Sequence, residues 1–371
     1  MGIFNRTTQK AMISEQPKKA AAAGAMMPAT NNSGAGMVGV YYSYFEGSQR
    51  QIAMSQPTIS RARDLHCTTI SCMNLRMYNE VWNSIEEKMQ KVFIAPRSWL
   101  RKIDPAVPNN FILSWTVDDL FIYGRSFWYI TSFSADGYPA SFTRLPANLV
   151  QTLDQPGPIF YAPSKQIIFQ GGELDAKNVV QFLSPIQGII YMSEKAIATA
   201  IKLENARYRN ASSAIPAGVL QVQPNSEPLS PQELSDLAAS FNAARATNQT
   251  AALSPEVHYI ETATSPDKML LIAASEYQSA DLCRLTNIPP YLAGISVGSY
   301  SYQNSKESRA DLWSFGTRAY ADCIASTLSQ DAYLPRGTFV EFNTEEYLES
   351  DYEPSNEMPN TQRNDEIGSR T

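Results

Sequence analysis

The stretch DLCRLTNIPPYLAGISVGSYSYQN, residues 281–304, decides how the rest of this chain is organised. A helical pattern leads into it, and Pro289-Pro290 ends that helix because proline has no backbone donor. Residues 291–303 carry no charge and contain glycines, which suits a loop whose backbone dihedrals must change. Asn304 is a good N-cap, and an amphipathic helix follows it to about Leu328. The pattern predicts a neutral loop held between two rigid helices.

This stretch resembles the tunnel region of portal proteins from long-tailed double-stranded-DNA bacteriophages. The resemblance is carried by the quoted run as far as Leu292, by SYSYQN at 299–304, and by the helix that follows. In that family the two helices flank a tunnel loop, which lines the narrowest part of a ring-shaped DNA channel. Taken alone, the same pattern would also fit two core helices joined by a serine-rich turn.

A second stretch follows the order of elements in the same family. A predicted helix ends at Gly124, residues 126–131 form a predicted strand, and Asp136-Gly137 marks a hairpin turn before Leu145-Pro146. This order is similar to the wing, which is the outer body of a portal subunit. Arg125-Ser126 departs from the family, which often has Asn-Ala there, and this departure concerns local packing.

Composition narrows the classes of function. The chain has 371 residues, a net charge of -6 and a pI near 5.2, which disfavours gripping nucleic acid through bulk positive charge. A protein that DNA slides past remains compatible with this charge. The four cysteines show no disulfide framework or CxxC spacing, and no run of about twenty apolar residues occurs. We therefore expect no metal site, no membrane span and synthesis in a reducing cytosol.

Several residues invite a catalytic interpretation that the surrounding sequence does not support. Asp118 and Asp119 form a carboxylate pair, but a solvated helix face is the expected explanation. His66 lies in a predicted helix over Thr58–Met73, and His258 lies in a predicted strand; both are expected to be structural. Nucleotide-binding and zinc-hydrolase motifs are absent from the sequence, so we expect no cofactor and no enzyme activity.

Further elements follow from periodicity and turn signals. Val38 to Phe45 fits a strand or a docking peptide, and Tyr161 to Phe169 fits a strand. One long helix is predicted over Ile189 to Arg209, which would span about 30 Å. Ser230-Pro231 with Glu233 starts another helix as a capping box. The helix after Asn304 has a predicted apolar stripe formed by Leu312, Phe315, Ala319 and Cys323.

The resemblance covers roughly residues 55–350 and implies an α+β portal fold that assembles as a ring. It divides the chain into a flexible arm (1–38), wing (39–185), first stem helix (186–212), clip (213–268), second stem helix (269–292), tunnel loop (293–303), tunnel helix with wing return (304–350) and disordered tail (351–371).

One competing motif points to a serine hydrolase. Gly294-Ile295-Ser296-Val297-Gly298 matches GxSxG, but a nucleophile elbow needs a strand before the serine, a helix after it and a later histidine. A Pro-Pro stop precedes this motif and no histidine follows His258. Ser296 is therefore a poor candidate nucleophile.

The function that the resemblance implies is mechanical. A dodecameric ring in the virion, at one capsid vertex, would pass double-stranded DNA non-specifically during packaging, retention and ejection. It would contact the terminase large subunit, the major capsid protein and a head–tail adaptor. Another head–tail connector protein is the alternative. The candidate channel-lining residues are Val297, Gly298, Ser299, Tyr300, Ser301, Tyr302 and Gln303.

Overall fold

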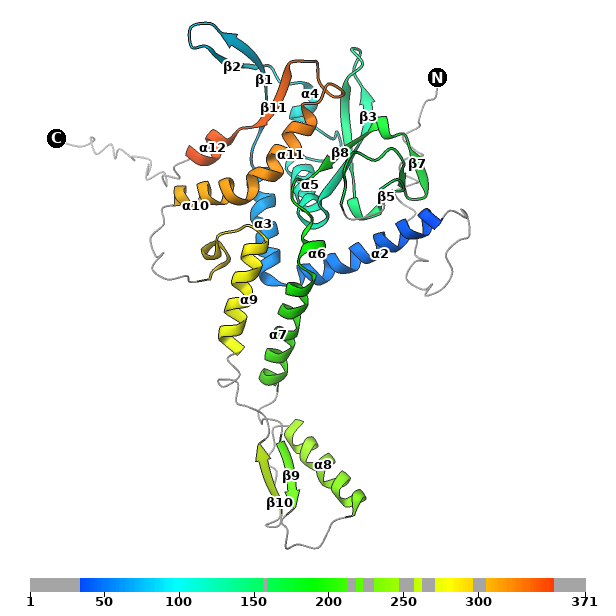
Figure 1. Cartoon of the computed structure of the whole chain (residues 1–371), viewed down its shortest axis with the longest axis vertical. Helices are drawn as coiled ribbons and strands as arrows, with labels where there is room; N and C mark the ends of the chain where they lie inside the picture. Colours follow the sequence, from blue (N-terminus) through cyan, green and yellow to red (C-terminus); the bar gives the residue numbers. More distant parts are fainter. Residues whose placement is uncertain are drawn as a thin grey trace, which may run out of the picture.

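The computed structural model describes residues 34–155, 159–212, 218–222, 230–246, 257–261, 271–295 and 305–349. Val297 to Gln303, Ser296 and the predicted tail from 351 lie outside these ranges. The described chain is a mixed helix-and-sheet protein with a broad body, a pair of helices below it and a small unit at the lower end (Figure 1).

The body is built around helix α5 (Asn109–Tyr123), which is covered on nearly all sides. Helices α2 (Gly34–Met54) and α3 (Pro57–Ser71) pack near it, with α4 (Ser98–Arg101) at the upper edge (Figure 1). Most residues of α5 are buried, and its apolar residues lie on all sides of the helix, which is typical of a helix in a core. The helix ends at Gly124, whose φ of 75° requires glycine and whose N–H donates to the Leu120 carbonyl. This confirms the predicted helix stop.

Three antiparallel sheets complete the body. The central sheet has the order β4–β3–β8, and Trp128 and Phe127 on β3 are fully buried. Its strands are β3 (Arg125–Phe133), β4 (Pro139–Leu145) and β8 (Val179–Leu183). The second sheet, β11–β1–β2, joins β1 (Leu75–Asn83) and β2 (Lys88–Ile94) to β11 (Thr338–Phe342) near the end of the chain. The hairpin predicted at Asp136-Gly137 is confirmed.

A small third sheet follows the central hairpin. It contains β5 (Val150–Thr152), β6 (Ile167–Phe169) and β7 (Gly172–Leu174), flanked by the 3-10 turns Ala147–Leu149 and Ala176–Asn178. The strand expected over Tyr161 to Phe169 was wrong over its first six residues, because β6 begins only at Ile167. The Gln155 side chain accepts from the Tyr161 amide and donates to the Ala162 carbonyl, so it holds this segment as a loop.

The lower part consists of two packed helices and a separate small unit (Figure 1). Helix α7 (Glu194–Ser212) lies beside α9 (Leu271–Leu285), and the Gln278 side chain donates to the Ala196 carbonyl at 3.1 Å. The unit below contains β9 (Gly218–Val222), β10 (Val257–Glu261) and α8 (Pro231–Ala246). The capping box at Ser230 is confirmed, since the Glu233 amide donates to its hydroxyl.

Two helix predictions are corrected. The single helix expected over Ile189 to Arg209 is interrupted at Ser193, which separates α6 (Ile189–Met192) from α7 and accepts from the Ile197 amide. The segment Val38 to Phe45, expected to be a strand or docking peptide, is part of α2. Residues 34–38, expected to belong to the flexible arm, are also helical. A buried ion pair holds α2 on the body: Arg125 donates to Glu46 at 2.6 Å. Long-range pairing of this kind cannot be read from local periodicity.

The last helical segment winds around an irregular turn. It consists of α10 (Ser305–Leu312), a π-helical turn (Trp313–Thr317) and α11 (Arg318–Leu328), with β11 and α12 (Thr344–Glu349) following. A π turn shifts the helical register by one residue. The predicted stripe is therefore wrong at Phe315, which is 74% exposed, while Gly316 and Thr317 face the core.

The expected solvated face at Asp118 and Asp119 was also wrong, because both side chains are buried. Arg50 of α2 donates two 2.9 Å hydrogen bonds to Asp118, and Arg63 of α3 donates a third at 2.6 Å. Arg144 of β4 binds Asp119 in a bidentate way, at 2.7 and 2.8 Å. Burial raises the pKa of Asp119 to about 6 against the opposing charge of Arg144, so the carboxylate stays ionised at pH 7.

All three arginines also lie against the Trp115 ring, with guanidinium carbons 5.1–5.6 Å from its centroid. The three arginines, the two carboxylates and the Trp115 ring form one charge cluster. It joins α2, α3 and β4 to α5. The carboxylates are structural, and each has an arginine partner.

Asp118→Ala should therefore destabilise the body strongly. Removing Asp118 leaves Arg50 and Arg63 half-buried without this carboxylate, although Arg63 keeps its pair with Asp64, and the loss is about 3 kcal/mol. Asp322→Ala is the matched control, since its pair with Arg318 is largely exposed and should contribute less than about 0.5 kcal/mol. Urea unfolding of both variants measures the difference, and equal losses would contradict the structural role of Asp118.

Candidate functional site

The candidate site is the loop between α9 and α10 together with its base. Val297 to Gln303 and Ser296 all fall among residues 296–304, outside the described residues. The described parts are the segment that leads out, Thr286–Ile295, and the segment that returns, Ser305–Thr317. We call these two segments the loop base.

The outgoing segment turns sharply at the end of α9. Asn287 has a φ of 54°, its amide donates to the Arg284 carbonyl, and the Ile288 amide donates to the Cys283 carbonyl. These two bonds form a Schellman cap with asparagine in the left-handed position, and Pro289 then prevents the helix from continuing. A 3-10 turn (Pro290–Ala293) follows and ends at Gly294, with a φ of 80°. The direction of the outgoing chain is thus set locally.

His66 of α3 connects the two segments of the loop base. Its Nε2 lies 3.0 Å from the Thr286 carbonyl oxygen, and its Nδ1 lies 3.0 Å from Thr317 Oγ1. A carbonyl can only accept, so Nε2 carries the proton, and in the neutral ring Nδ1 accepts from the Thr317 hydroxyl. Complete burial lowers the pKa of His66 to about 4, which keeps the ring neutral at pH 7.

The π turn brings the returning helix close enough for this bridge. A Cβ at Gly316 would lie 2.5 Å from the Asn287 carbonyl oxygen and 2.7 Å from His66 Cε1, so only glycine fits there. The Tyr320 and Phe121 rings pack on the imidazole, with centroids 5.5 and 5.7 Å away. Both segments of the loop base are therefore packed against one residue of α3.

Two further hydrogen bonds tie the 3-10 turn in place. The Tyr291 hydroxyl donates to Asp311 of α10 at 3.2 Å, and Arg61 of α3 donates to the Leu292 carbonyl at 3.3 Å. The base is thus held from α3 and α10 together. Such an arrangement can present a segment of chain from a fixed position, which is a mechanical capability and requires no reacting group.

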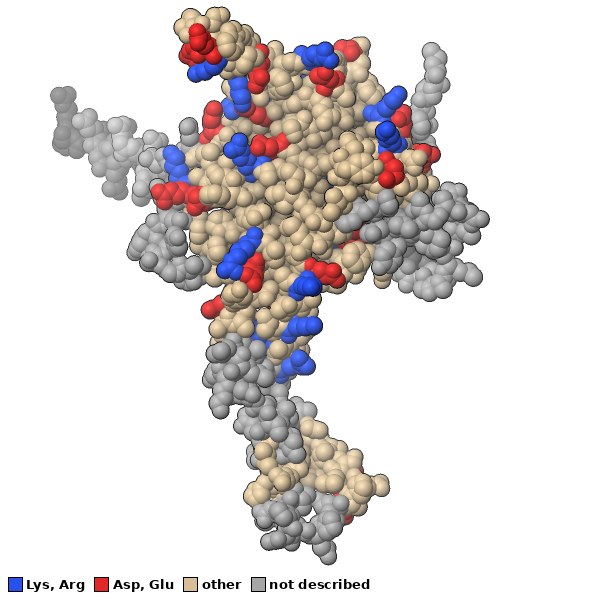
Figure 2. Space-filling model, in the orientation of Figure 1, with Lys and Arg blue, Asp and Glu red and all other residues tan. Residues whose placement is uncertain are grey.

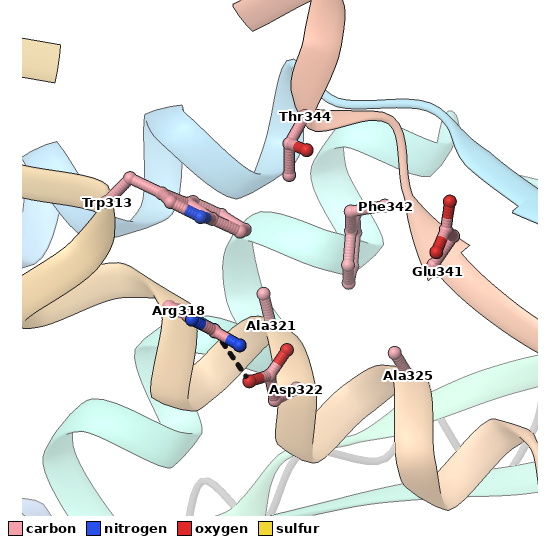
Figure 3. Close-up of a pocket in the computed structure, with 8 residues that line it drawn as sticks. All are labelled: Trp313, Arg318, Ala321, Asp322, Ala325, Glu341, Phe342 and Thr344. Carbon is pink, nitrogen blue, oxygen red and sulfur yellow. Dashed lines mark hydrogen bonds and ion pairs between the residues drawn. The ribbon is translucent and has the colours of Figure 1, made fainter. Parts of the chain in front are cut away.

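A shallow pocket of about 230 Å³ lies on the other side of the returning helix (Figure 3). Arg318 and Asp322 pair at its mouth, and no histidine, cysteine or serine lines it. Its lining residues are Trp313, Arg318, Ala321, Asp322, Ala325, Glu341, Phe342 and Thr344. Among the described residues, no group of three or more potential ligands could hold a metal ion.

The described surroundings do not fit a serine hydrolase. A 3-10 turn occupies the position before Ser296 where a nucleophile elbow would have a strand. Both nitrogens of His66 are engaged in the loop base, and His258 lies in β10 of the lower unit.

Sequence reasoning gave His66 a structural role but missed its position at the base of the loop. The Gly316-Thr317 pair inside an amphipathic helix was the available signal, since glycine there indicates a close backbone approach. Nothing in the sequence shows that the approaching group lies 251 residues away, on α3.

The family model "Phage portal protein" matches residues 57–370. The chain belongs to the phage portal protein family. Helix α2 lies before the matched region, and no described helix has the length and apolar character of a membrane span. Among curated protein sequences, none matches this chain.

Solved structures share this fold at low sequence identity. An HK97-family phage portal protein from Corynebacterium diphtheriae is 20% identical, with a TM-score of 0.64 over 81% of this chain and 98% of that one. A chain from the neck of a native gene transfer agent (GTA) particle, computed with C12 symmetry, is 13% identical, with a TM-score of 0.53 over 81% of this chain and 84% of that one. A chain from the virion of a native GTA particle is 12% identical, with a TM-score of 0.54 over 81% of this chain and 84% of that one. These likenesses show the portal fold.

The buried imidazole predicts an acid-sensitive loop base. The unfolded chain protonates His66 near pH 6.5 and the folded chain only near pH 4, so the free energy of unfolding falls as pH drops through that window. The full loss is about 3 kcal/mol. Urea unfolding at several pH values gives the slope of the free energy of unfolding against pH. In His66→Gln this slope should be smaller, by an amount that corresponds to at most about one bound proton.

Thr317→Val is the control for this experiment. It removes the hydroxyl that donates to Nδ1 but keeps the buried imidazole, so it should lower stability while retaining a steep dependence on pH. An unchanged dependence in His66→Gln would contradict the assignment.

Proposed function

We propose that this protein forms a closed ring around a DNA channel at one vertex of a virion capsid. In this assignment the body is the wing, the α7–α9 pair is the stem, the unit of α8, β9 and β10 is the clip, and α10 to α11 form the tunnel helix. Membership of the portal family and the location of related folds in GTA neck and virion particles support a portal or connector role.

The observation that carries the proposal is the doubly held base of the loop. Thr286 and Thr317 are fixed to one imidazole, so the nine residues between Ile295 and Ser305 start and return at a defined place. A chain of that length that doubles back reaches at most about 15 Å from its base. Copies arranged in a ring would then present these segments at the same height in the channel.

The chemistry of the loop residues suits passage of DNA without gripping it. Residues 296–304 include no charged side chain, so they offer no fixed ion pair to phosphates. Serine and tyrosine hydroxyls can exchange hydrogen bonds with passing water and phosphate. The role is mechanical and contains no bond-making step.

The remaining partners follow from the same assignment. The clip would face the terminase large subunit during packaging and a head–tail adaptor afterwards, and the wing would face the major capsid protein. A dodecameric ring is proposed here, in line with the C12 symmetry used for the GTA neck. A head–tail adaptor role for this chain is less well supported, because the portal family model spans residues 57–370.

Ring formation is the first prediction of the proposed function. Purified protein should assemble into closed rings with a central hole, visible by negative-stain electron microscopy and measurable as a mass by native mass spectrometry. A protein that stays monomeric at all concentrations, in the presence of scaffold and capsid proteins as well, would contradict the proposal.

The second prediction concerns the loop. Deletion of Ser299–Tyr302 should leave ring assembly intact but impair DNA packaging or retention, measured as the fraction of DNA-filled heads in a complementation assay. A same-length Gly-Ser-Gly-Ser replacement of residues 299–302 is the control, and it should retain more packaging because reach and neutrality are preserved. Normal packaging by the deletion variant would remove the loop from the mechanism.

A further inference from the structure

The β1–β2 hairpin stands out from the body without cover (Figures 1 and 2). Every residue from Glu80 to Phe93 is exposed except Asn83, which is half-buried. Six of them are large apolar residues: Val81, Trp82, Ile85, Met89, Val92 and Phe93. Two-stranded hairpins are marginal in water, and soluble monomers rarely expose apolar patches of this kind. The hairpin therefore has the character of an interface.

The strand register shows which part of the hairpin is available. Trp82 lies directly opposite Met89, and Tyr78 lies opposite Phe93 on the same face. The Arg76 guanidinium covers the Phe93 ring at 4.4 Å, and the Lys91 ammonium covers the Tyr78 ring at 4.5 Å. No such cation lies on Trp82 among the described residues, and its side chain is 57% exposed. The free part is the outer end, with Trp82, Met89 and Ile85.

The manner of contact follows from the edge strand. β2 is the edge of the β11–β1–β2 sheet, so its outer backbone groups are open to pairing with another strand. Lys88 and Lys91 lie on that strand, and lysines on an edge discourage strand addition. Contact through side chains at the outer end, anchored by tryptophan, is therefore favoured.

A complementary surface lies elsewhere on the same chain, near α4. Arg101 and Lys102 are exposed at the end of α4, and Phe111 and Phe133 are about half exposed. Two hydrogen bonds link the segments that carry these residues: Arg97 binds Asp136 of the β3–β4 turn at 2.7 Å, and Asn109 donates to the Leu100 carbonyl at 3.0 Å. We call Arg101, Lys102, Phe111 and Phe133 the α4 surface.

The charges of this surface are opposite to the net charge of the hairpin. The hairpin from Glu80 to Lys91 carries Glu80, Glu86 and Glu87 against two lysines, with Glu86 paired to Lys88 at 2.7 Å, whereas the α4 surface carries two exposed cations. Asp104, the nearest acid in sequence, is buried and bonded to Thr143. Apolar residues beside opposite charges are typical of interfaces between proteins.

The two surfaces also lie at the same end of the molecule, at different places along its upper edge. In Figure 1 the hairpin projects at the upper left, while α4 and the β3–β4 hairpin lie at the upper edge farther right. A ring whose axis runs along the long axis of the chain relates neighbours by rotation, so each surface keeps its height. Two different patches of one chain then meet between neighbours, as a heterologous ring contact requires.

We propose that the β1–β2 hairpin of one copy docks on the α4 surface of the next copy, with Trp82 and Met89 against Phe111 or Phe133 and Glu86 and Glu87 near Arg101 and Lys102. The inference rests on the proposed ring and assigns its outer contact to named residues.

A charge exchange tests the contact. The double variant Glu86→Lys/Glu87→Lys and the double variant Arg101→Glu/Lys102→Glu should each lower the ring fraction at a fixed subunit concentration by about tenfold or more. Combining all four substitutions restores opposite charges and should recover ring formation. Native mass spectrometry gives the ring fraction, and circular dichroism checks that each subunit is folded.

Two further variants separate the contact from general surface effects. Trp82→Ser removes the apolar anchor and should also lower the ring fraction, whereas Tyr161→Ser, at another exposed aromatic outside the hairpin, should leave it unchanged. Full ring formation by the charge variants and by Trp82→Ser would overturn the inference and leave the proposed ring standing. Rings that form normally but fail to enter capsids would assign the hairpin to the capsid protein and overturn it too.

The variant that combines all four charge substitutions tests the α4 surface as the acceptor. Failure of the four substitutions to recover rings would overturn the assignment of the α4 surface as the acceptor. If wild-type protein forms no rings, the proposed function fails before any variant is compared.

Discussion

The neutral, buried imidazole of His66 is the constraint on which the candidate site depends. It joins the C-terminal cap of α9 to the π turn before α11 through one donated and one accepted hydrogen bond. A charged ring could not accept from Thr317, and burial opposes charging it. The close approach of Gly316 to the Asn287 carbonyl leaves no room for a side chain at position 316. The contacts of His66 therefore both fix the loop base and stabilise the body.

The charge cluster around Trp115 has a comparable role within the body. Asp118 and Asp119 are adjacent on α5 but bind different elements, so one helix turn holds α2, α3 and β4 together. α3 carries both Arg63 and His66, which places the charge cluster and the loop base on one helix, less than one turn apart. A force on the loop would reach the body through α3.

Helix α2 extends the structure beyond the part that the portal family model matches. Its attachment uses Glu46, Arg50 and the buried Ala53, and Glu46 also accepts from the Tyr191 hydroxyl of α6. α6 leads directly into α7, so α2 supports the junction between the body and the helix pair. The irregular Ser193 between α6 and α7 lies at that same junction.

The sequence by itself determined the elements whose signals act within a few residues. Pro289 ended α9, Gly124 ended α5, the Ser230 capping box started α8, and Asp136-Gly137 closed a hairpin, because caps and turns depend on local backbone geometry and donors. The order of helix, uncharged segment and helix could be predicted in the same way, and this order carried the resemblance to the portal family. Only the tertiary structure decided what is buried: the Asp118 and Asp119 carboxylates, the imidazole of His66, and Gly316 in place of Phe315. Their partners lie 25 to 251 residues away along the chain, and periodicity carries no information about contacts at that separation.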